Sequence, residues 1–214
     1  MTISLVISVT ILILILTIIY VQKPSLFYTT NDYPKLKIIE DNFQIISSEI
    51  PEFDPVNNSY PRRDNSWPSN LDKKRFEEYL QTQVTSTWLQ GWQGDCIWYN
   101  FPLIYNDQVI DRAGEICPKT IEILNKISGK TIVGFALLTP GSSLYKHRDP
   151  TGKKFGSMAA NMLLTDNKNA NLYVSDQVYT HSLGKMVIFD STELHSADNN
   201  DNTLRTILYI DFKT

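Results

Sequence analysis

The hydrophobic residues of this chain follow three different patterns from one end to the other. Residues 3–21 are mostly Ile, Leu and Val, without a charge, a glycine or a proline. Between about residues 39 and 127, apolar side chains recur every three or four positions, the spacing of one helix face. From residue 131 onwards the apolar runs are short, β-branched or aromatic, and separated by Gly, Asn, Asp and Pro. We therefore expect an apolar N-terminal segment, a helical part and a strand-rich part.

The N-terminal segment has the length of a membrane span. As a helix, about 19 residues rise roughly 28 Å, close to the thickness of the bilayer's hydrocarbon core. We expect an uncleaved, single-pass transmembrane anchor over residues 1–22, because the basic start and small-x-small site of a cleaved signal peptide are missing. Lys23, Lys35 and Lys37 follow the segment and weakly favour a cytosolic domain. The sequon at Asn57 would suit the opposite side, so the side of the membrane stays open.

Beyond the anchor, residues 23–32 are expected to form a short polar tether and residues 33–214 one domain. Three helices are predicted, over residues 39–50, 71–89 and 118–127. Five strands are predicted, over residues 131–138, 159–164, 171–174, 185–189 and 204–212. Helices followed by many short strands predict a mainly β fold, a sandwich or barrel with flanking helices packed outside.

Composition and charge narrow the range of functions. With 20 Lys and Arg against 23 Asp and Glu, the net charge is −3. No basic surplus is left to coat a nucleic-acid backbone, so nucleic-acid binding is not expected. Cys96 and Cys117 are too few for a disulfide scaffold and lack the spacing of a zinc site, and whether they pair stays open.

Residues with metal-binding chemistry concentrate in the strand-rich part. In an extended chain, residues two apart point to the same side, so His147 and Asp149 can converge on one ion. Together with His195 they would form the set of two histidines and one carboxylate found in non-haem Fe(II) oxygenases. Arg205, in the last predicted strand, can donate bidentate hydrogen bonds to a carboxylate of a dicarboxylate cosubstrate. His181, the third histidine, is assigned to a loop hydrogen bond.

From Trp98 to Asp211 the sequence resembles the aspartyl/asparaginyl β-hydroxylases, a family of Fe(II)- and 2-oxoglutarate-dependent dioxygenases. The shared pieces occur in order, and they are Trp98-Tyr99-Asn100-Phe101-Pro102-Leu103, Cys117-Pro118-Lys119-Thr120, Leu138-Thr139-Pro140-Gly141-Ser142 before His147, Gly184 to Asp190 before His195, and Arg205 before Leu208 to Asp211. Residues from Tyr33 to Ile50 also resemble the start of that domain. The ordered set, rather than any one piece, carries the resemblance.

The resemblance implies a fold, a set of cofactors and a reaction. The fold would be a double-stranded β-helix, a cupin-like jelly roll, preceded here by the transmembrane helix. His147, Asp149 and His195 would bind iron, and Arg205 would bind the distal carboxylate of 2-oxoglutarate. With O2 as the other cosubstrate, such enzymes hydroxylate a C–H bond while 2-oxoglutarate is converted to succinate. The expected substrate is an Asp or Asn side chain of a protein or peptide.

Three positions depart from the family's pattern. Asp149 stands where the animal members have glycine, so this chain has a complete facial triad. The strand after the metal loop lacks the usual basic residue and histidine. In that strand, which begins with Ala159, the only polar residue is Asn161, and it is the candidate for holding the cosubstrate. How the metal-proximal carboxylate of 2-oxoglutarate is held therefore stays open. Finally, the usual acidic pair has become Asp190-Ser191, which would alter the surroundings of His195.

Two other functions fit the same residues. One is an oxygenase of the same type that acts on a lipid acyl chain, which a membrane anchor would hold near the active site. The other is a non-catalytic, cupin-like binding module, against which the complete triad and Arg205 argue, because a structural role requires neither. The aromatic residues Tyr145, Trp98 and Tyr99 are candidates for lining the substrate pocket. The sequence makes no prediction of the substrate's identity or of the oligomeric state.

Overall fold

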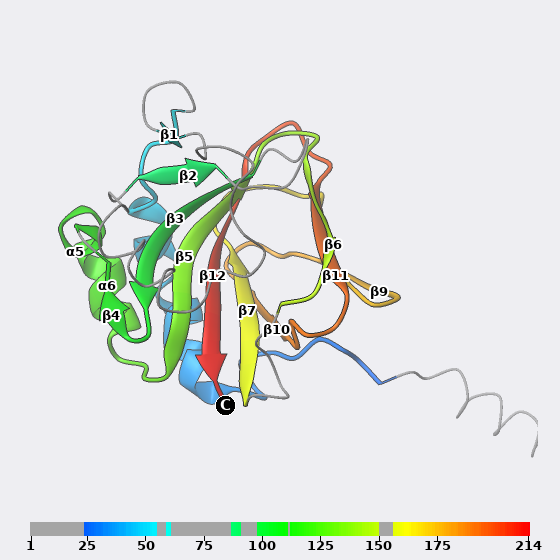
Figure 1. Cartoon of the computed structure of the whole chain (residues 1–214), viewed down its shortest axis with the longest axis horizontal. Coiled ribbons are helices and arrows are strands. Elements are labelled where there is room, and N and C mark those ends of the chain that lie inside the picture. The colour runs from blue at the N-terminus through cyan, green and yellow to red at the C-terminus, as the bar shows by residue number, and fades with distance from the viewer. Residues whose placement is uncertain (1–23, 55–58, 61–86, 91–97, 111, 150–155) are drawn as a thin grey trace, which may run out of the picture.

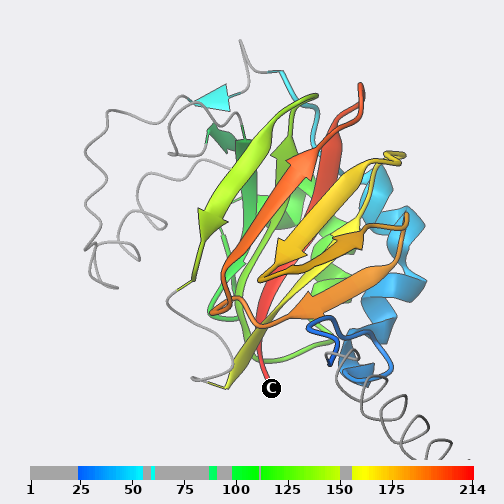
Figure 2. The ribbon, with the colours of Figure 1, turned by 90° about the vertical axis from the view of Figure 1, so that its right-hand side faces the viewer.

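Two β-sheets packed face to face, with helices against one of them, make up the protein (Figures 1 and 2). The computed structural model describes residues 24–54, 59–60, 87–90, 98–110, 112–149 and 156–214. Within these ranges no helix has the length and hydrophobicity needed to cross a bilayer. The anchor predicted over residues 1–22 lies outside the described residues and stays a prediction.

The larger sheet has the strand order β1-β2-β3-β5-β12-β7-β10, with β4 paired to β3. Its strands are β1 (Ser59–Tyr60), β2 (Trp88–Gln90), β3 (Trp98–Tyr105), β4 (Gln108–Val109), β5 (Lys130–Leu138), β7 (Ser157–Leu163), β10 (Met186–Phe189) and β12 (Arg205–Lys213). The smaller sheet has the order β6-β11-β8-β9. Its strands are β6 (Ser143–His147), β8 (Ala170–Val174), β9 (Gln177–Thr180) and β11 (His195–Asn199).

The eight strands from β5 to β12 have jelly-roll topology. Counted from β5, the first, eighth, third and sixth strands are neighbours in the larger sheet, and the second, seventh, fourth and fifth form the smaller one. Every pairing among these eight strands is antiparallel. Two interlocked four-stranded layers of this kind define a jelly roll. The prediction of a mainly β jelly roll with flanking helices is confirmed.

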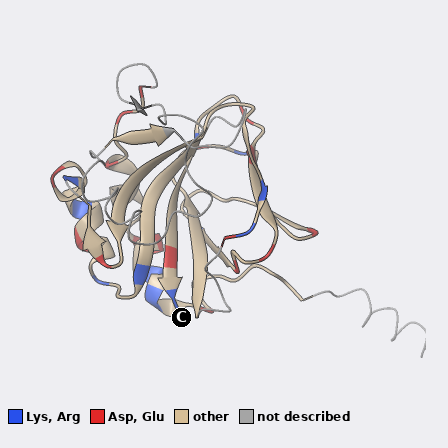
Figure 3. Cartoon of the chain, in the orientation of Figure 1, with Lys and Arg blue, Asp and Glu red and all other residues tan. Residues whose placement is uncertain are grey.

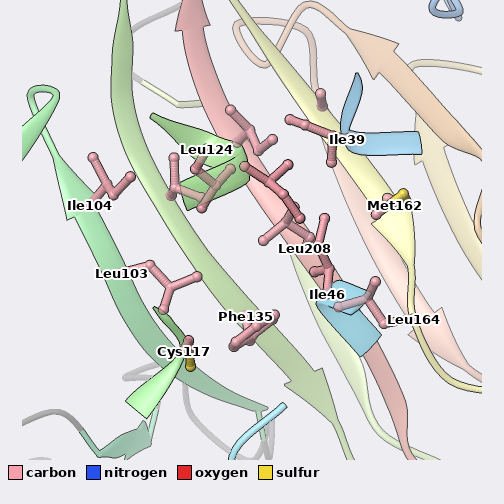
Figure 4. Packing of buried hydrophobic residues seen from close by; sticks show 14 of the residues in the cluster. Ile39, Ile46, Leu103, Ile104, Cys117, Leu124, Phe135, Met162, Leu164 and Leu208 are labelled. Atoms are coloured by element: carbon pink, nitrogen blue, oxygen red, sulfur yellow. The ribbon is translucent and has the colours of Figure 1, made fainter. Parts of the chain in front are cut away.

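Helices cover the outer face of the larger sheet (Figure 1). They are η1 (Pro34–Leu36), α2 (Lys37–Asp41), α3 (Phe43–Ser48), α5 (Ala113–Ile116) and α6 (Pro118–Leu124). Ile39, Ile46 and Leu124 from these helices share one buried cluster with Phe135 and Leu208 of the sheet (Figure 4). Because the smaller sheet covers the other face, all residues of β7 are buried. The sequences of the central strands are therefore continuous apolar runs, in which apolar and polar residues do not alternate.

The predicted elements agree with the structure in most places. All five predicted strands are present, as β5, β7, β8, β10 and β12. The helix predicted over 39–50 is divided at Asn42 into α2 and α3, and the third predicted helix is α6. The helix predicted over 71–89 is wrong at its end, because Trp88 and Leu89 pair with neighbouring strands in β2. Its residues 71–86 lie outside the described residues.

The described part of the expected tether packs against the domain. Tyr28 and Ile188 exchange two backbone hydrogen bonds of 2.8 and 2.9 Å. The side-chain amide of Gln177 on β9 donates to the Pro24 carbonyl, and its oxygen accepts from the Leu26 N–H. Residues 24–28 are therefore attached along β9 and β10, next to the segment predicted to enter the membrane.

Gly184, between β9 and β10, is expected to tolerate no side chain. It has a φ of +68°, and a Cβ there would lie 2.8 Å from Phe43 Cγ. Gly156 has a φ of +70°, and no atom of the other described residues lies within 4 Å of a Cβ built there, so it is a matched control for backbone strain. We expect Gly184→Ala to lower the free energy of unfolding by about 1–3 kcal/mol more than Gly156→Ala, measured by urea denaturation. Equal losses would contradict this packing.

Candidate metal and cosubstrate site

The smaller sheet brings two histidines together. His147 ends β6 and His195 begins β11, and the two residues are direct partners in the antiparallel ladder (Figure 2 shows this sheet). Their ring centroids lie 4.1 Å apart. The register shifts between His195 and Ala197, so a bulge follows this pair. Residues 48 positions apart in the sequence thus present their imidazoles side by side.

Asp149 completes a three-residue group. Its backbone N–H donates to the Ser191 carbonyl at 2.9 Å, which fixes the chain just after β6. Its Oδ1 lies 3.7 Å from His147 Nε2, and its Oδ2 lies 3.9 Å from His195 Nε2. One ligand atom from each of the three residues lies within 4.8 Å of the others. The sequence predicted that His147 and Asp149, which are two residues apart, point to the same side of the chain. This arrangement agrees with that prediction.

Backbone carbonyls orient both imidazoles. His147 Nδ1 lies 2.8 Å from the Tyr145 carbonyl, and His195 Nδ1 lies 2.9 Å from the Glu193 carbonyl. Each Nδ1 therefore carries the proton and donates, which leaves the Nε2 lone pair facing Asp149. Burial lowers the pKa of His195, although the Asp149 carboxylate acts in the opposite direction. The neutral imidazole is the form that binds metals.

The donor set fits Fe(II). Two neutral imidazoles and one carboxylate, with the remaining positions open, are the ligands of non-haem Fe(II) oxygenases. Two atoms bound to one ion at about 2.1 Å each lie at most about 4.2 Å apart. The 3.7 Å from Asp149 Oδ1 to His147 Nε2 and the 3.9 Å from Asp149 Oδ2 to His195 Nε2 lie within that limit, and the set of three ligand atoms, which lie within 4.8 Å of one another, exceeds it by less than about 1 Å. The three side chains can therefore bind one ion with little movement.

Arg205 lies between the two sheets, at the start of β12. It is 3% exposed, and its Nη2 lies 3.2 Å from Nε2 of the equally buried His181. Its Nε–H is buried without a hydrogen-bond partner, and within the described part of the chain Arg205 forms no ion pair. Burial lowers the pKa of the guanidinium to about 10, so it is charged at neutral pH. A buried cation with an unused donor is suited to bind an anionic ligand, because the anion would compensate the buried charge.

Asn161 lies on β7 in the same interior layer. It is the direct partner of Val187 on β10 and of Tyr209 on β12, and it is 4% exposed. Its Oδ1 has no hydrogen-bond partner in the described part of the chain. The predicted role of Asn161 in holding the cosubstrate stays a prediction, and its place between the sheets is compatible with it.

The aromatic candidates fall on different faces. Trp98 pairs with Leu138, which also pairs with Arg205, so Trp98 shares the inner face of the larger sheet. Tyr145 is 46% exposed, and its ring lies edge-on to His147 at 5.9 Å. Tyr99 belongs instead to the core beneath the helices, so its assignment to the pocket is wrong. Adjacent residues of a strand point to opposite faces, which separates Trp98 from Tyr99.

Sequence reasoning missed two residues of this site. His181, assigned to a loop, is buried against Arg205. Tyr209 donates a long, 3.5 Å hydrogen bond from its hydroxyl to Asp149 Oδ2, and burial raises its pKa well above 10.0. Counting by twos along the last strand from Arg205 would have found Tyr209. Charged residues are scarce on the central strands of the larger sheet (Figure 3). The buried Arg205 on β12 is one of the few. Cys117 is buried and forms no disulfide within the described residues; Cys96 lies outside them, so whether the two cysteines pair stays open.

One family model and two known proteins match the sequence of this chain. The family model described as Aspartyl/Asparaginyl beta-hydroxylase matches residues 40–214. The chain is 28% identical over 138 residues to the ornithine lipid ester-linked acyl 2-hydroxylase of Rhizobium tropici, covering 64% of this chain and 49% of that protein. It is 22% identical over 201 residues to uncharacterized protein L888 of Acanthamoeba polyphaga mimivirus, covering 89% and 72%. It thus spans about half the length of the lipid hydroxylase.

Similar solved structures are distant. An oxidoreductase of the 2OG-Fe(II) oxygenase family from Burkholderia pseudomallei has a TM-score of 0.43 at 11% identity, over 66% of this chain and 80% of that chain. The Cnp3 cupin domain of Schizosaccharomyces pombe has a TM-score of 0.38 at 8% identity, over 55% and 65%. At these scores the likeness supports no conclusion about function, and the assignment of the fold rests on the strand order.

Proposed function

This chain belongs to the aspartyl/asparaginyl β-hydroxylase family, and we propose that it is an Fe(II)- and 2-oxoglutarate-dependent dioxygenase that hydroxylates a C–H bond. The observation that carries the proposal is that the interior of this domain contains both a candidate metal site and a candidate carboxylate-binding site. His147, Asp149 and His195 converge as a metal-binding triad, and Arg205 is a buried cation without an ion pair among the described residues. A non-catalytic binding module would need neither a facial triad nor a carboxylate-binding arginine.

Each residue has a distinct task in this proposal. The two Nε2 atoms and the Asp149 carboxylate would hold Fe(II), and a set of only three protein ligands would leave room for the cosubstrates. Arg205 binds the distal carboxylate of 2-oxoglutarate through charge-assisted hydrogen bonds. When bound, Fe(II), 2-oxoglutarate and O2 supply the oxidation, in which one oxygen atom enters the substrate C–H bond and the other enters succinate as CO2 is released. The two sheets bury Arg205 away from water, which strengthens its interaction with the carboxylate.

An acyl chain of a membrane lipid is the substrate class that we propose. The relative from Rhizobium tropici is named as a lipid acyl hydroxylase, and it matches 64% of this chain. The apolar residues 3–21 would anchor the domain at a membrane, and the exposed ring of Tyr145 beside His147 offers an apolar contact near the metal. The family's description favours the alternative, an Asp or Asn side chain of a peptide.

Product analysis tests the substrate class. The full-length protein, in membranes of an expression host, is supplied with Fe(II), ascorbate and 2-oxoglutarate, once with a lipid extract and once with Asp- and Asn-containing peptides. We expect mass spectrometry to find one added oxygen atom in lipid acyl chains, and only when 2-oxoglutarate is present. An added oxygen in the peptides, with unchanged lipids, would show that the alternative is correct.

A further inference from the structure

His181 makes a buried contact that the proposed chemistry does not require. The residue follows β9, and its backbone N–H donates to the Ala170 carbonyl at 2.9 Å. Its side chain is 4% exposed and points to the interior, where Nε2 lies 3.2 Å from Arg205 Nη2. The metal-binding group formed by His147, Asp149 and His195 does not include it. His181 therefore acts, if at all, through Arg205.

The chemistry of the two side chains fixes the direction of this hydrogen bond. A guanidinium has five N–H donors and no acceptor, so Nε2 of His181 must accept. A neutral imidazole with an acceptor at Nε2 carries its proton on Nδ1, and a protonated ring would present an N–H to the Arg205 N–H instead. Burial, and then the charge of Arg205, lower the pKa of His181 well below its usual 6.5. His181 is therefore neutral at physiological pH.

A neutral partner leaves the charge of Arg205 uncancelled. Asp198 is the carboxylate that most affects the pKa of Arg205, but its oxygens accept hydrogen bonds from Asn171 Nδ2 at 2.9 Å and from Tyr173 Oη at 2.7 Å. The Nε–H of Arg205 has no hydrogen-bond partner among the residues that the structure describes. The guanidinium is thus held in one orientation by an uncharged acceptor, and it keeps both its charge and a donor for a ligand.

We propose that His181 is a positioning residue of the cosubstrate pocket, which orients Arg205 for the carboxylate of 2-oxoglutarate while leaving its positive charge intact. This role rests on the proposed function. It makes two separate demands on position 181, an acceptor that reaches Arg205 and the absence of a negative charge. A carboxylate there would orient the guanidinium equally well, but it would neutralise the charge that the cosubstrate needs.

A matched pair of variants separates the two demands. His181→Gln places a neutral amide oxygen near the position of Nε2, and His181→Glu places a carboxylate of the same size there. His181→Phe fills the space without an acceptor. The full-length protein is loaded with Co(II), which occupies the triad without turnover, and 2-oxoglutarate binding is measured by calorimetry. A separate Co(II) titration of each variant measures metal affinity.

We expect His181→Gln to bind 2-oxoglutarate within about threefold of the wild type. The dissociation constant should rise about tenfold in His181→Phe, which loses the hydrogen bond to a charged group, and about 100-fold in His181→Glu, which also cancels the charge. Co(II) affinity should be the same in all four proteins. A merely structural role of His181 would not separate Gln from Glu in this way.

Two results would overturn this role. Equal dissociation constants for the Gln and Glu variants would show that charge at position 181 is irrelevant. If His181→Glu does not fold, as shown by its melting curve, equal binding by the Gln and Phe variants would show that the acceptor is irrelevant. A wild-type protein that binds Co(II) but no 2-oxoglutarate is a different failure, because it contradicts the proposed function itself and His181 then has no pocket to organise.

Discussion

Replacing Arg205 with methionine is expected to weaken 2-oxoglutarate binding by about 30-fold or more, with metal affinity unchanged. Removing one partner of a buried, hydrogen-bonded charge pair costs about 2–5 kcal/mol, and each 1.4 kcal/mol is about a factor of ten. The binding measurement is calorimetry on the Co(II)-loaded protein. Arg205 is buried without an ion pair among the described residues, so its loss is not expected to lower the free energy of unfolding of the ligand-free protein.

Arg112 provides a matched control for this substitution. Its guanidinium is exposed and forms a surface ion pair with Glu115 at 2.8 Å. Such pairs contribute little, so Arg112→Met should change neither stability nor 2-oxoglutarate binding measurably. If Arg205→Met binds 2-oxoglutarate as tightly as Arg112→Met does, Arg205 is not the cosubstrate's anchor.

Loss of a triad side chain is expected to abolish stable iron binding. His195→Ala and Asp149→Ala each remove one of three ligand atoms that lie within 4.8 Å of one another. Changing residues that only support metal ligands lowers metal affinity by about 10–100-fold, and removing a ligand should cost at least as much. The iron bound per chain after anaerobic loading measures the effect. Asp166→Ala, at an exposed aspartate outside the site, is the control and should bind iron normally.

Asp149 is the informative member of the triad. The animal members that the chain resembles have a glycine at this position and function with two histidines. If Asp149→Ala retained iron and full turnover, this chain would work in the same way, and the 3.7 and 3.9 Å approaches to the histidines would have no catalytic meaning. We expect the opposite, because Asp149 is fixed by the Ser191 carbonyl and contacted by Tyr209.

The sequence predicted the fold where burial is two-sided. Strands such as β5, β7 and β12 are covered on both faces, so their sequences are continuous apolar runs. Such runs can be recognised in the sequence even though apolar and polar residues do not alternate in them. It missed β6 and β11, which carry the two histidines. Their sequences, SLYKH and HSADN, are short and largely polar, and they become strands through pairing with each other and with β8. Local propensity cannot report such long-range pairing.

The triad and Arg205 were predicted from residue types and order, but their surroundings were not. His181 lies 24 positions before Arg205, and only the packing of the smaller sheet onto β12 brings the two side chains within 3.2 Å. Tyr99 failed as a pocket residue because one step along β3 turns a side chain to the helix-covered face. Ligand residues follow motifs, whereas their supporting contacts depend on the tertiary fold.

Succinate formation tests the central claim most directly. The full-length protein is incubated with Fe(II), ascorbate, O2 and 2-oxoglutarate, and succinate is quantified by mass spectrometry, beside His195→Ala and Asp166→Ala proteins prepared in the same way. A dioxygenase releases succinate, slowly even without its substrate. We predict succinate from the wild type and Asp166→Ala and none above background from His195→Ala. Equal succinate from wild type and His195→Ala, or none from any of them, would contradict the account.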